Sequence, residues 1–188
     1  MMMEKRQINS EFNIQSRTVE GYAVCFDTPS EDLGFIEIIH RGAITQDTIN
    51  NSDVLAKFNH NDDKVLARSK NGSGSLLLEV DDKGVRYLFD APNTALGDEL
   101  LEYLNRGDIT SSSFAFTVPK TEGAERWYKK DGIIYRDIYQ IDKLYDVSPV
   151  FQPAYQTTTC SKRFNEITKQ VEEIDNIMNL YTKEIDEL

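Results

Sequence analysis

Apolar residues stand at every second position in several short segments of the first 150 residues, for example in 76–80 and 85–89. Side chains of a strand point alternately to its two faces, so this spacing is typical of strands with one buried face. The sequence DDKG lies between these two segments, and its glycine tolerates the positive φ that a tight turn needs. The pattern therefore predicts a β-hairpin over residues 76–89.

The same reasoning predicts a β-rich α+β protein whose body has few helices. One helix is expected at 94–105, because its leucines share a face, a threonine or asparagine can cap its start, and Gly107 suits the position after its end. A helical turn is expected at 46–50. Further strands are expected at 11–27 (one or two strands), 35–39, 54–58, 109–118 and 143–150, with a second hairpin that turns at 130–132.

The spacing of apolar residues changes after Phe164. Steps of four and three then alternate as far as Leu188, which is a heptad pattern over about three heptads. An amphipathic helix that lies on the body would show the same pattern. We therefore expect two parts, a domain over residues 1–160 and a helical tail over 161–188 that forms a coiled coil or docks.

Composition narrows the possible functions. The 188 residues carry a formal net charge of −11, which argues against non-specific nucleic-acid binding because that requires clustered lysine and arginine. Cys25 and Cys160 lack the spacing of metal ligands, and two lone cysteines favour a reducing compartment over a disulfide. No segment approaches the ~20 apolar residues of a membrane span, and the first 20 residues lack a signal peptide. We expect an intracellular protein without metal or cofactor.

Three residues could together cleave a peptide bond: His60 in FNHND, Ser113 in TSSSFAF and Asp146 in YDVSP. A serine hydroxyl becomes a strong nucleophile near neutral pH when a base takes its proton and a third group orients that base. His60 lies in a polar turn, and a free imidazole titrates near pH ~6.5. Ser113 opens a strand on which it shares a face with the small Ala115, which leaves room for a substrate backbone.

Each of these assignments has an alternative. His60 could be an ordinary surface histidine, and His40 is the competing base, because the chain has two histidines. Ser111 points to the same side as Ser113 and is the alternative nucleophile, and Asp146 could be an exposed strand carboxylate. The chain lacks a G-x-S-x-G elbow, an H-E-x-x-H helix, a phosphate loop and a dinucleotide fingerprint, which removes several other enzyme classes.

The segments GYAVCFDTPS, FIEIIHRGAI, VLAKFNHNDDKVLARS, DAPNTALGDELLEYLNRGDITSSSFAF and LYDVSPVFQPAYQTTT occur in this order between Phe12 and Thr159. As a set they resemble the prohead (capsid-maturation) serine proteases of tailed bacteriophages. The resemblance implies His60 as general base, Ser113 as nucleophile and Asp146 as third member. The chain departs from the family pattern at Asp146, where glutamate is common, and at Ala115, where glycine is common.

The resemblance also implies a fold related to the herpesvirus assemblin proteases, a mostly antiparallel β-barrel surrounded by a few helices. It implies a serine endopeptidase that cleaves scaffold or delta segments of the major capsid protein and processes itself. Such an enzyme works inside the assembling procapsid in the host cytoplasm, as a homo-oligomer, without nucleic acid or membrane as partner. For the oxyanion, Arg68 is a candidate donor, with Arg86 and Arg106 as alternatives. The competing hypothesis is a non-catalytic capsid-assembly or scaffold-binding protein.

Overall fold

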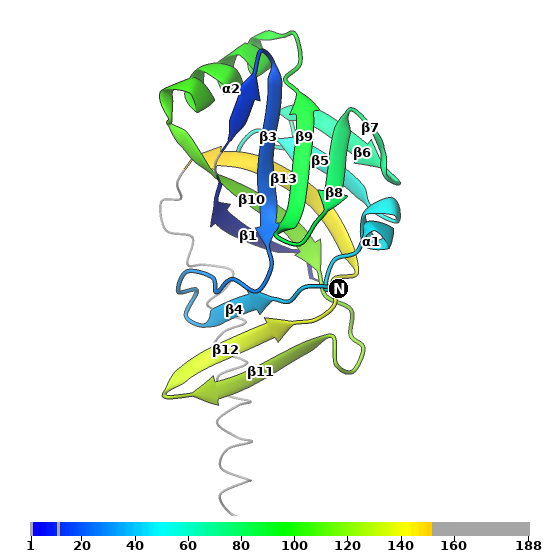
Figure 1. The fold of residues 1–188 in the computed structure, drawn as a ribbon, viewed down its shortest axis with the longest axis vertical. Coiled ribbons are helices and arrows are strands. Elements are labelled where there is room, and N and C mark those ends of the chain that lie inside the picture. The colour runs from blue at the N-terminus through cyan, green and yellow to red at the C-terminus, as the bar shows by residue number, and fades with distance from the viewer. Residues whose placement is uncertain (1, 11, 152–188) are drawn as a thin grey trace, which may run out of the picture.

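Strands dominate the computed structural model, which describes residues 2–10 and 12–151 (Figure 1). The largest sheet has six strands in the order β1-β10-β13-β5-β6-β7. Their bounds are Glu4–Asn9 (β1), Ile109–Thr117 (β10), Lys143–Phe151 (β13), Asp53–Lys57 (β5), Val65–Lys70 (β6) and Ser73–Gly74 (β7). All its pairs are antiparallel except β13–β5, which is parallel.

Two smaller sheets complete the body. The four-stranded sheet is antiparallel and contains β2 (Asn13–Gln15), β3 (Thr18–Cys25), β9 (Gly84–Asp90) and β8 (Leu76–Val80), in that order. The three-stranded sheet contains β11 (Glu125–Lys130), β12 (Ile133–Ile138) and β4 (Ile36–Ile39), and its β12–β4 pair is parallel. In Figure 1 this sheet lies at the lower end of the body.

The sequence prediction of a β-rich, mostly antiparallel body with few helices is confirmed. The expected closed barrel is not found among the described strands, because their hydrogen bonds divide them into three separate sheets. The expected helical tail over 161–188 lies outside the described residues, so the division into two parts stays a prediction.

The two helices of the described residues lie within one residue of the predicted ranges. The helix α2 (Ala95–Arg106) begins after Thr94, whose side chain accepts a hydrogen bond from the Gly97 amide, and it ends at Gly107 in the left-handed region at φ 74°. The short helix α1 (Gln46–Asn50) begins with a capping box between Thr45 and Thr48.

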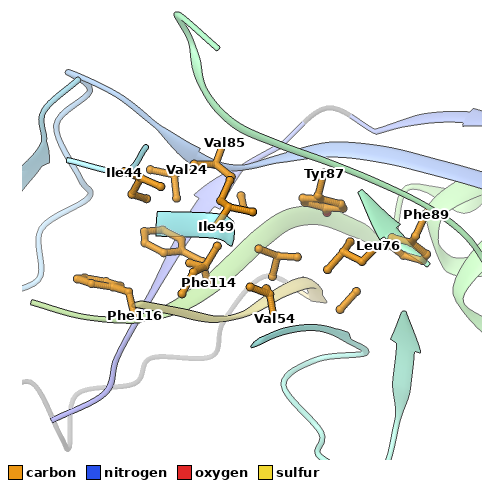
Figure 2. Packing of buried hydrophobic residues seen from close by; sticks show 14 of the residues in the cluster. Val24, Ile44, Ile49, Val54, Leu76, Val85, Tyr87, Phe89, Phe114 and Phe116 are labelled. Carbon is orange, nitrogen blue, oxygen red and sulfur yellow. The ribbon is translucent and has the colours of Figure 1, made fainter. Parts of the chain in front are cut away.

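The hydrophobic core lies between the six-stranded and four-stranded sheets. Figure 2 shows Tyr87 and Phe89 of β9 on one side and Val54 and Phe114 on the other. The Tyr87 hydroxyl is buried there and is hydrogen bonded to Ser112 Oγ at 2.7 Å, which satisfies a polar group that would otherwise destabilise the core. The alternation of β10 thus turns Ser112 inward and leaves its two serine neighbours on the opposite face of the sheet.

The first strand is held by charged side chains, which the hydrophobic pattern did not predict. Arg6 of β1 donates to Glu37 of β4 at 2.6 and 2.8 Å, and Arg136 of β12 donates to the same carboxylate at 2.8 Å. Glu4 joins this network through both arginines. All four side chains are at most 8% exposed. The network joins the N-terminal strand to the three-stranded sheet and thereby fixes β1 beside β10.

Candidate active site

The three adjacent serines of β10 have different partners. Ser113 lies opposite Gln7 of β1 and Ser148 of β13, and it is 4% exposed. Ser111 Oγ donates to Asn9 Oδ1 at 3.4 Å, while Ser112 is bonded to Tyr87 in the core. Of the three hydroxyls, that of Ser113 is the one hydrogen bonded to a histidine.

His60 reaches Ser113 from a tight turn that follows β5. Asn59 and His60 both adopt left-handed backbone angles, at φ 54° and 57°. Such angles are uncommon for residues with a Cβ and cost on the order of 1–3 kcal/mol each. Main-chain hydrogen bonds hold the turn, and one of them joins it to β13, because the Asn59 amide donates to the Pro149 carbonyl at 3.0 Å. The fold therefore holds the imidazole over the six-stranded sheet.

His60 lies between the serine and a buried carboxylate. Its Nε2 is hydrogen bonded to Ser113 Oγ, and its Nδ1 is 2.8 Å from Asp146 Oδ1. This second contact is at hydrogen-bond distance but is not well aligned, and it becomes an ion pair when the imidazole is protonated. The histidine side chain is 19% exposed and that of Asp146 is 1% exposed. A base with a buried anion behind it and a hydroxyl in front can take the hydroxyl proton.

Asp146 has two more partners beside the histidine. Ser148 Oγ donates to Oδ1 at 3.0 Å, and Lys57 Nζ lies 3.6 Å from Oδ2. Burial alone would raise the pKa of the Asp146 carboxyl, but the contacts with His60, Ser148 and Lys57 outweigh burial, and the pKa is lowered from its ordinary value. Asp146 is therefore an anion at neutral pH, as the orienting member of a triad must be.

A main-chain carbonyl gives Ser113 a second acceptor. Ser113 Oγ donates to the Arg6 carbonyl of β1 at 2.6 Å. A hydroxyl has one proton, so it cannot donate to this carbonyl and to His60 at once. When His60 is protonated, its Nε2–H can donate to Ser113 Oγ while the serine donates to Arg6. When His60 is neutral, the serine can donate to Nε2 instead, and this second state is the one prepared for attack.

The competing base, His40, has a different environment. Its Nδ1 is 3.1 Å from Asp27 Oδ1, its Nε2 is 3.2 Å from Asp137 Oδ1, and its ring stacks on Tyr139 with centroids 4.6 Å apart. Both ring nitrogens thus face carboxylates, and no serine hydroxyl in the described part of the chain is bonded to this ring. This arrangement suits a structural ion pair.

The arginines considered for the oxyanion are engaged elsewhere. Both Arg68 nitrogens that face Asp53 donate to it, at 2.8 and 2.5 Å, and within residues 2–10 and 12–151 no contact joins Arg68 to the triad. Arg86 pairs with Glu20 and Glu79, and Arg106 pairs with Asp108. The structure therefore does not bring Arg68 to Ser113, and its predicted role has no geometric support.

Lys57 and Ser148 were not singled out by the sequence. Ser148 had a usable signal, since it lies two positions from Asp146 on a strand and must share its face. Lys57 had none, because its approach to Asp146 depends on the parallel pairing of β5 with β13. Over residues 2–10 and 12–151, no group of histidine, cysteine, aspartate and glutamate could hold a metal ion. No helix in that range is long and apolar enough to cross a membrane.

The chain is similar to known proteins in its sequence and in its fold. The model of the family described as caudovirus prohead serine protease matches residues 4–175. Among solved structures, the chain is similar to the capsid assembly protease gp21 of bacteriophage T4, with 14% sequence identity and a TM-score of 0.44. The match covers 81% of this chain and 97% of the T4 chain. No curated protein matches the sequence significantly.

Proposed function

The chain belongs to the caudovirus prohead serine protease family, and on that premise we propose that Ser113 is its nucleophile, His60 its general base and Asp146 the carboxylate that orients the base. Family membership makes the protein a serine protease of capsid maturation and decides against a purely structural assembly protein. The observation that carries the residue assignment is the continuous series of contacts from Asp146 through His60 to Ser113.

The contacts support the following mechanism. Ser113 Oγ attacks the scissile carbonyl carbon while His60 Nε2 takes the hydroxyl proton. The imidazolium, stabilised by Asp146, then gives this proton to the leaving amine, and the peptide bond breaks to leave an acyl-enzyme. A water molecule loses a proton to His60 as it attacks the ester, and the serine regains that proton when the acid product leaves. Because the nucleophile lies on a strand, an extended substrate segment is the form most easily aligned with it.

We propose as substrates the major capsid protein and its scaffold or delta region, cleaved inside the assembling procapsid in the host cytoplasm, together with sites in the protease itself. Homo-oligomer formation belongs to the same proposal, and so does docking or self-association of the predicted tail. We also propose kinship with the β-barrel of the herpesvirus assemblin proteases. The mostly antiparallel pairing supports it, and so does the hydrophobic cluster that includes residues of all three sheets.

The proposal is tested by co-expression with the cognate major capsid protein. We expect capsid cleavage with the wild type, none with Ser113→Ala, and normal cleavage with the matched control Ser111→Ala. Replacement of the nucleophile in a serine protease lowers kcat by roughly 10⁶-fold, so a gel or intact-mass measurement separates these outcomes easily. Cleavage that survives Ser113→Ala but stops in Ser111→Ala would assign the nucleophile to Ser111.

A further inference from the structure

Lys57 is a charged residue beside the triad to which the mechanism above gives no task. It is the last residue of β5, and its side chain is 12% exposed. Its Nζ lies 2.7 Å from Asp62 Oδ1 and 3.6 Å from Asp146 Oδ2. One ammonium group thus contacts two carboxylates, of which Asp146 is buried and Asp62 is 88% exposed.

The two carboxylates belong to different parts of the site. Asp146 lies on β13 inside the sheet, whereas Asp62 lies on the turn that carries His60. His60 and Ser148 contact Oδ1 of Asp146, and Lys57 contacts Oδ2. Burial of a carboxylate destabilises the fold unless an opposite charge and hydrogen bonds compensate the lost hydration. Lys57 supplies the permanent positive charge, and through Asp62 it also contacts the turn.

The turn needs such support because of its backbone. Asn59 and His60 both hold left-handed angles, which persist only where the surroundings favour them. Main-chain hydrogen bonds hold the turn, one of them to Pro149 of β13, and the Lys57–Asp62 pair adds a side-chain link between the end of β5 and the far side of the turn. Without this link the imidazole can shift relative to the hydroxyl, and a misplacement of about 1 Å can cost on the order of 10²-fold in rate.

We propose that Lys57 is a positioning residue of this protease, whose ammonium group bridges Asp146 and Asp62 and so keeps the His60 turn aligned with the triad carboxylate. This inference rests on the proposed function of the triad. Lys57 acts through Asp146 and Asp62 and does not touch the substrate.

The charges around His60 give the proposal a pH signature. Asp146 of β13 contacts the imidazole, and Asp62 of the same turn interacts with it electrostatically. Lys57 of β5 contacts both carboxylates, and Lys5 of β1 acts electrostatically on Asp62. Ser113 from β10 is neutral. Removal of the Lys57 charge leaves two carboxylates less compensated beside the ring, which favours the imidazolium. The reaction rate should then reach its plateau at a higher pH than in the wild type.

The test is the rate at which a fluorophosphonate probe labels Ser113, measured from pH 5 to 9. This probe needs the activated hydroxyl but no knowledge of the natural cleavage site. We expect Lys57→Met to label about 10- to 100-fold more slowly at neutral pH, with the acidic limb of its pH profile moved to higher pH. Lys57→Arg keeps the charge and should recover most of the rate and the original profile.

Lys64 offers a matched control, because it lies in the same segment but pairs with Glu99 at 3.5 Å and lies over the Phe58 ring. Lys64→Met should label within about twofold of the wild type, as is usual for a surface substitution. Asp62→Asn should share the slower labelling of Lys57→Met but not its shift to higher pH, because it removes a negative charge near His60. Asp63→Asn should show neither change. Since Asp62 is exposed, its variant remains informative even if Lys57→Met fails to fold, which circular dichroism shows.

The outcomes separate the two claims. If wild type is not labelled on Ser113, the proposed function fails. If wild type is labelled and Asp62→Asn or a folded Lys57→Met reproduces its rate and pH profile, the triad stands and the role of Lys57 is refuted. The role of Lys57 is also refuted if Lys57→Met and Lys57→Arg lose labelling equally and the pH profile of labelling stays that of the wild type.

Discussion

The two histidines of this protein have similar carboxylate partners and different tasks. In each, Nδ1 lies near an aspartate oxygen, 2.8 Å from Asp146 for His60 and 3.1 Å from Asp27 for His40. The difference is at Nε2, where His60 meets the hydroxyl of Ser113 and His40 meets the carboxylate of Asp137. A hydroxyl can be activated by the loss of a proton, whereas an ionised carboxylate has none to give. The partner of Nε2 thus separates a base from a structural ion pair.

Exposure alone would not have distinguished the two rings. The His40 side chain is 29% exposed and that of His60 is 19% exposed. Their backbones do differ, because His60 lies in the left-handed region, on a turn bonded to the same strand that carries Asp146. His40 instead connects β4 to β12 through Asp137 and stacks on Tyr139. One region is built for proton transfer and the other for the attachment of a sheet.

The largest effect that would test this comparison is the loss of each imidazole in turn. His60→Ala should lower kcat for capsid cleavage by roughly 10⁶-fold, because a triad without its base behaves as a triad without its nucleophile. His40→Ala should leave kcat within about twofold, since its contacts are with carboxylates outside the triad. Initial rates of capsid-protein cleavage measure both. A reversed order would make His40 the base.

The carboxylates behind the two rings provide the second comparison. Asp146→Asn should reduce kcat by about 10⁴-fold, because an amide no longer stabilises the imidazolium or fixes its tautomer. Asp27→Asn makes the same chemical change behind His40 and should leave cleavage nearly unchanged. Equal losses in the two variants would mean that Asp146 has no special role.

The third comparison concerns stability, and it sets a buried arginine against an exposed one. Arg136→Met should lower the free energy of unfolding by about 3–5 kcal/mol, because it removes one of the two arginines that compensate the buried carboxylates of Glu4 and Glu37. Arg126→Met, on the exposed neighbouring strand, should change it by less than about 0.5 kcal/mol. Urea unfolding measures both values. Equal midpoints for the two variants would show that the buried network contributes little.

The smallest effect concerns how the free energy of unfolding changes at low pH. The pKa of Asp146 is lowered in the folded protein, so its ionised form adds stability above the ordinary aspartate value near ~3.9, and this contribution is lost as pH falls through the lowered pKa. The difference in unfolding free energy between wild type and Asp146→Asn should therefore be constant near neutrality and shrink in strong acid. Urea unfolding at several pH values checks this. A difference that grows towards low pH would contradict the direction of the shift.

Much of the fold could be predicted from the sequence because its elements bury apolar side chains with a regular period. The β8–β9 hairpin and α2 with its Thr94 and Gly107 ends are of this kind. The strand β1 could not be predicted, because it buries Glu4 and Arg6 in an ion network instead of an apolar stripe. The strand β6 was also missed. Its burial pattern does not alternate regularly, since Leu66 and Ala67 are both buried.

The residues of the candidate site could be predicted from the sequence, but most of the contacts around them could not. His60, Ser113 and Asp146 lie in short motifs with distinctive chemistry, and the structure brings them together. The contacts of Lys57 and of the Arg6 carbonyl depend on which strands are neighbours, and that follows from tertiary pairing rather than from any local pattern. The pairing of Arg68 with Asp53 also depends on neighbouring strands, β6 and β5. The sequence therefore did not show that Arg68 is engaged away from the oxyanion.

The most direct test of the triad is to map the serine that a fluorophosphonate modifies, by mass spectrometry of the digested adduct. We predict one adduct on Ser113 in the wild type and in His40→Ala, and almost none in His60→Ala. An adduct on Ser111 or another serine, or equal labelling of Ser113 without the His60 imidazole, would contradict the account.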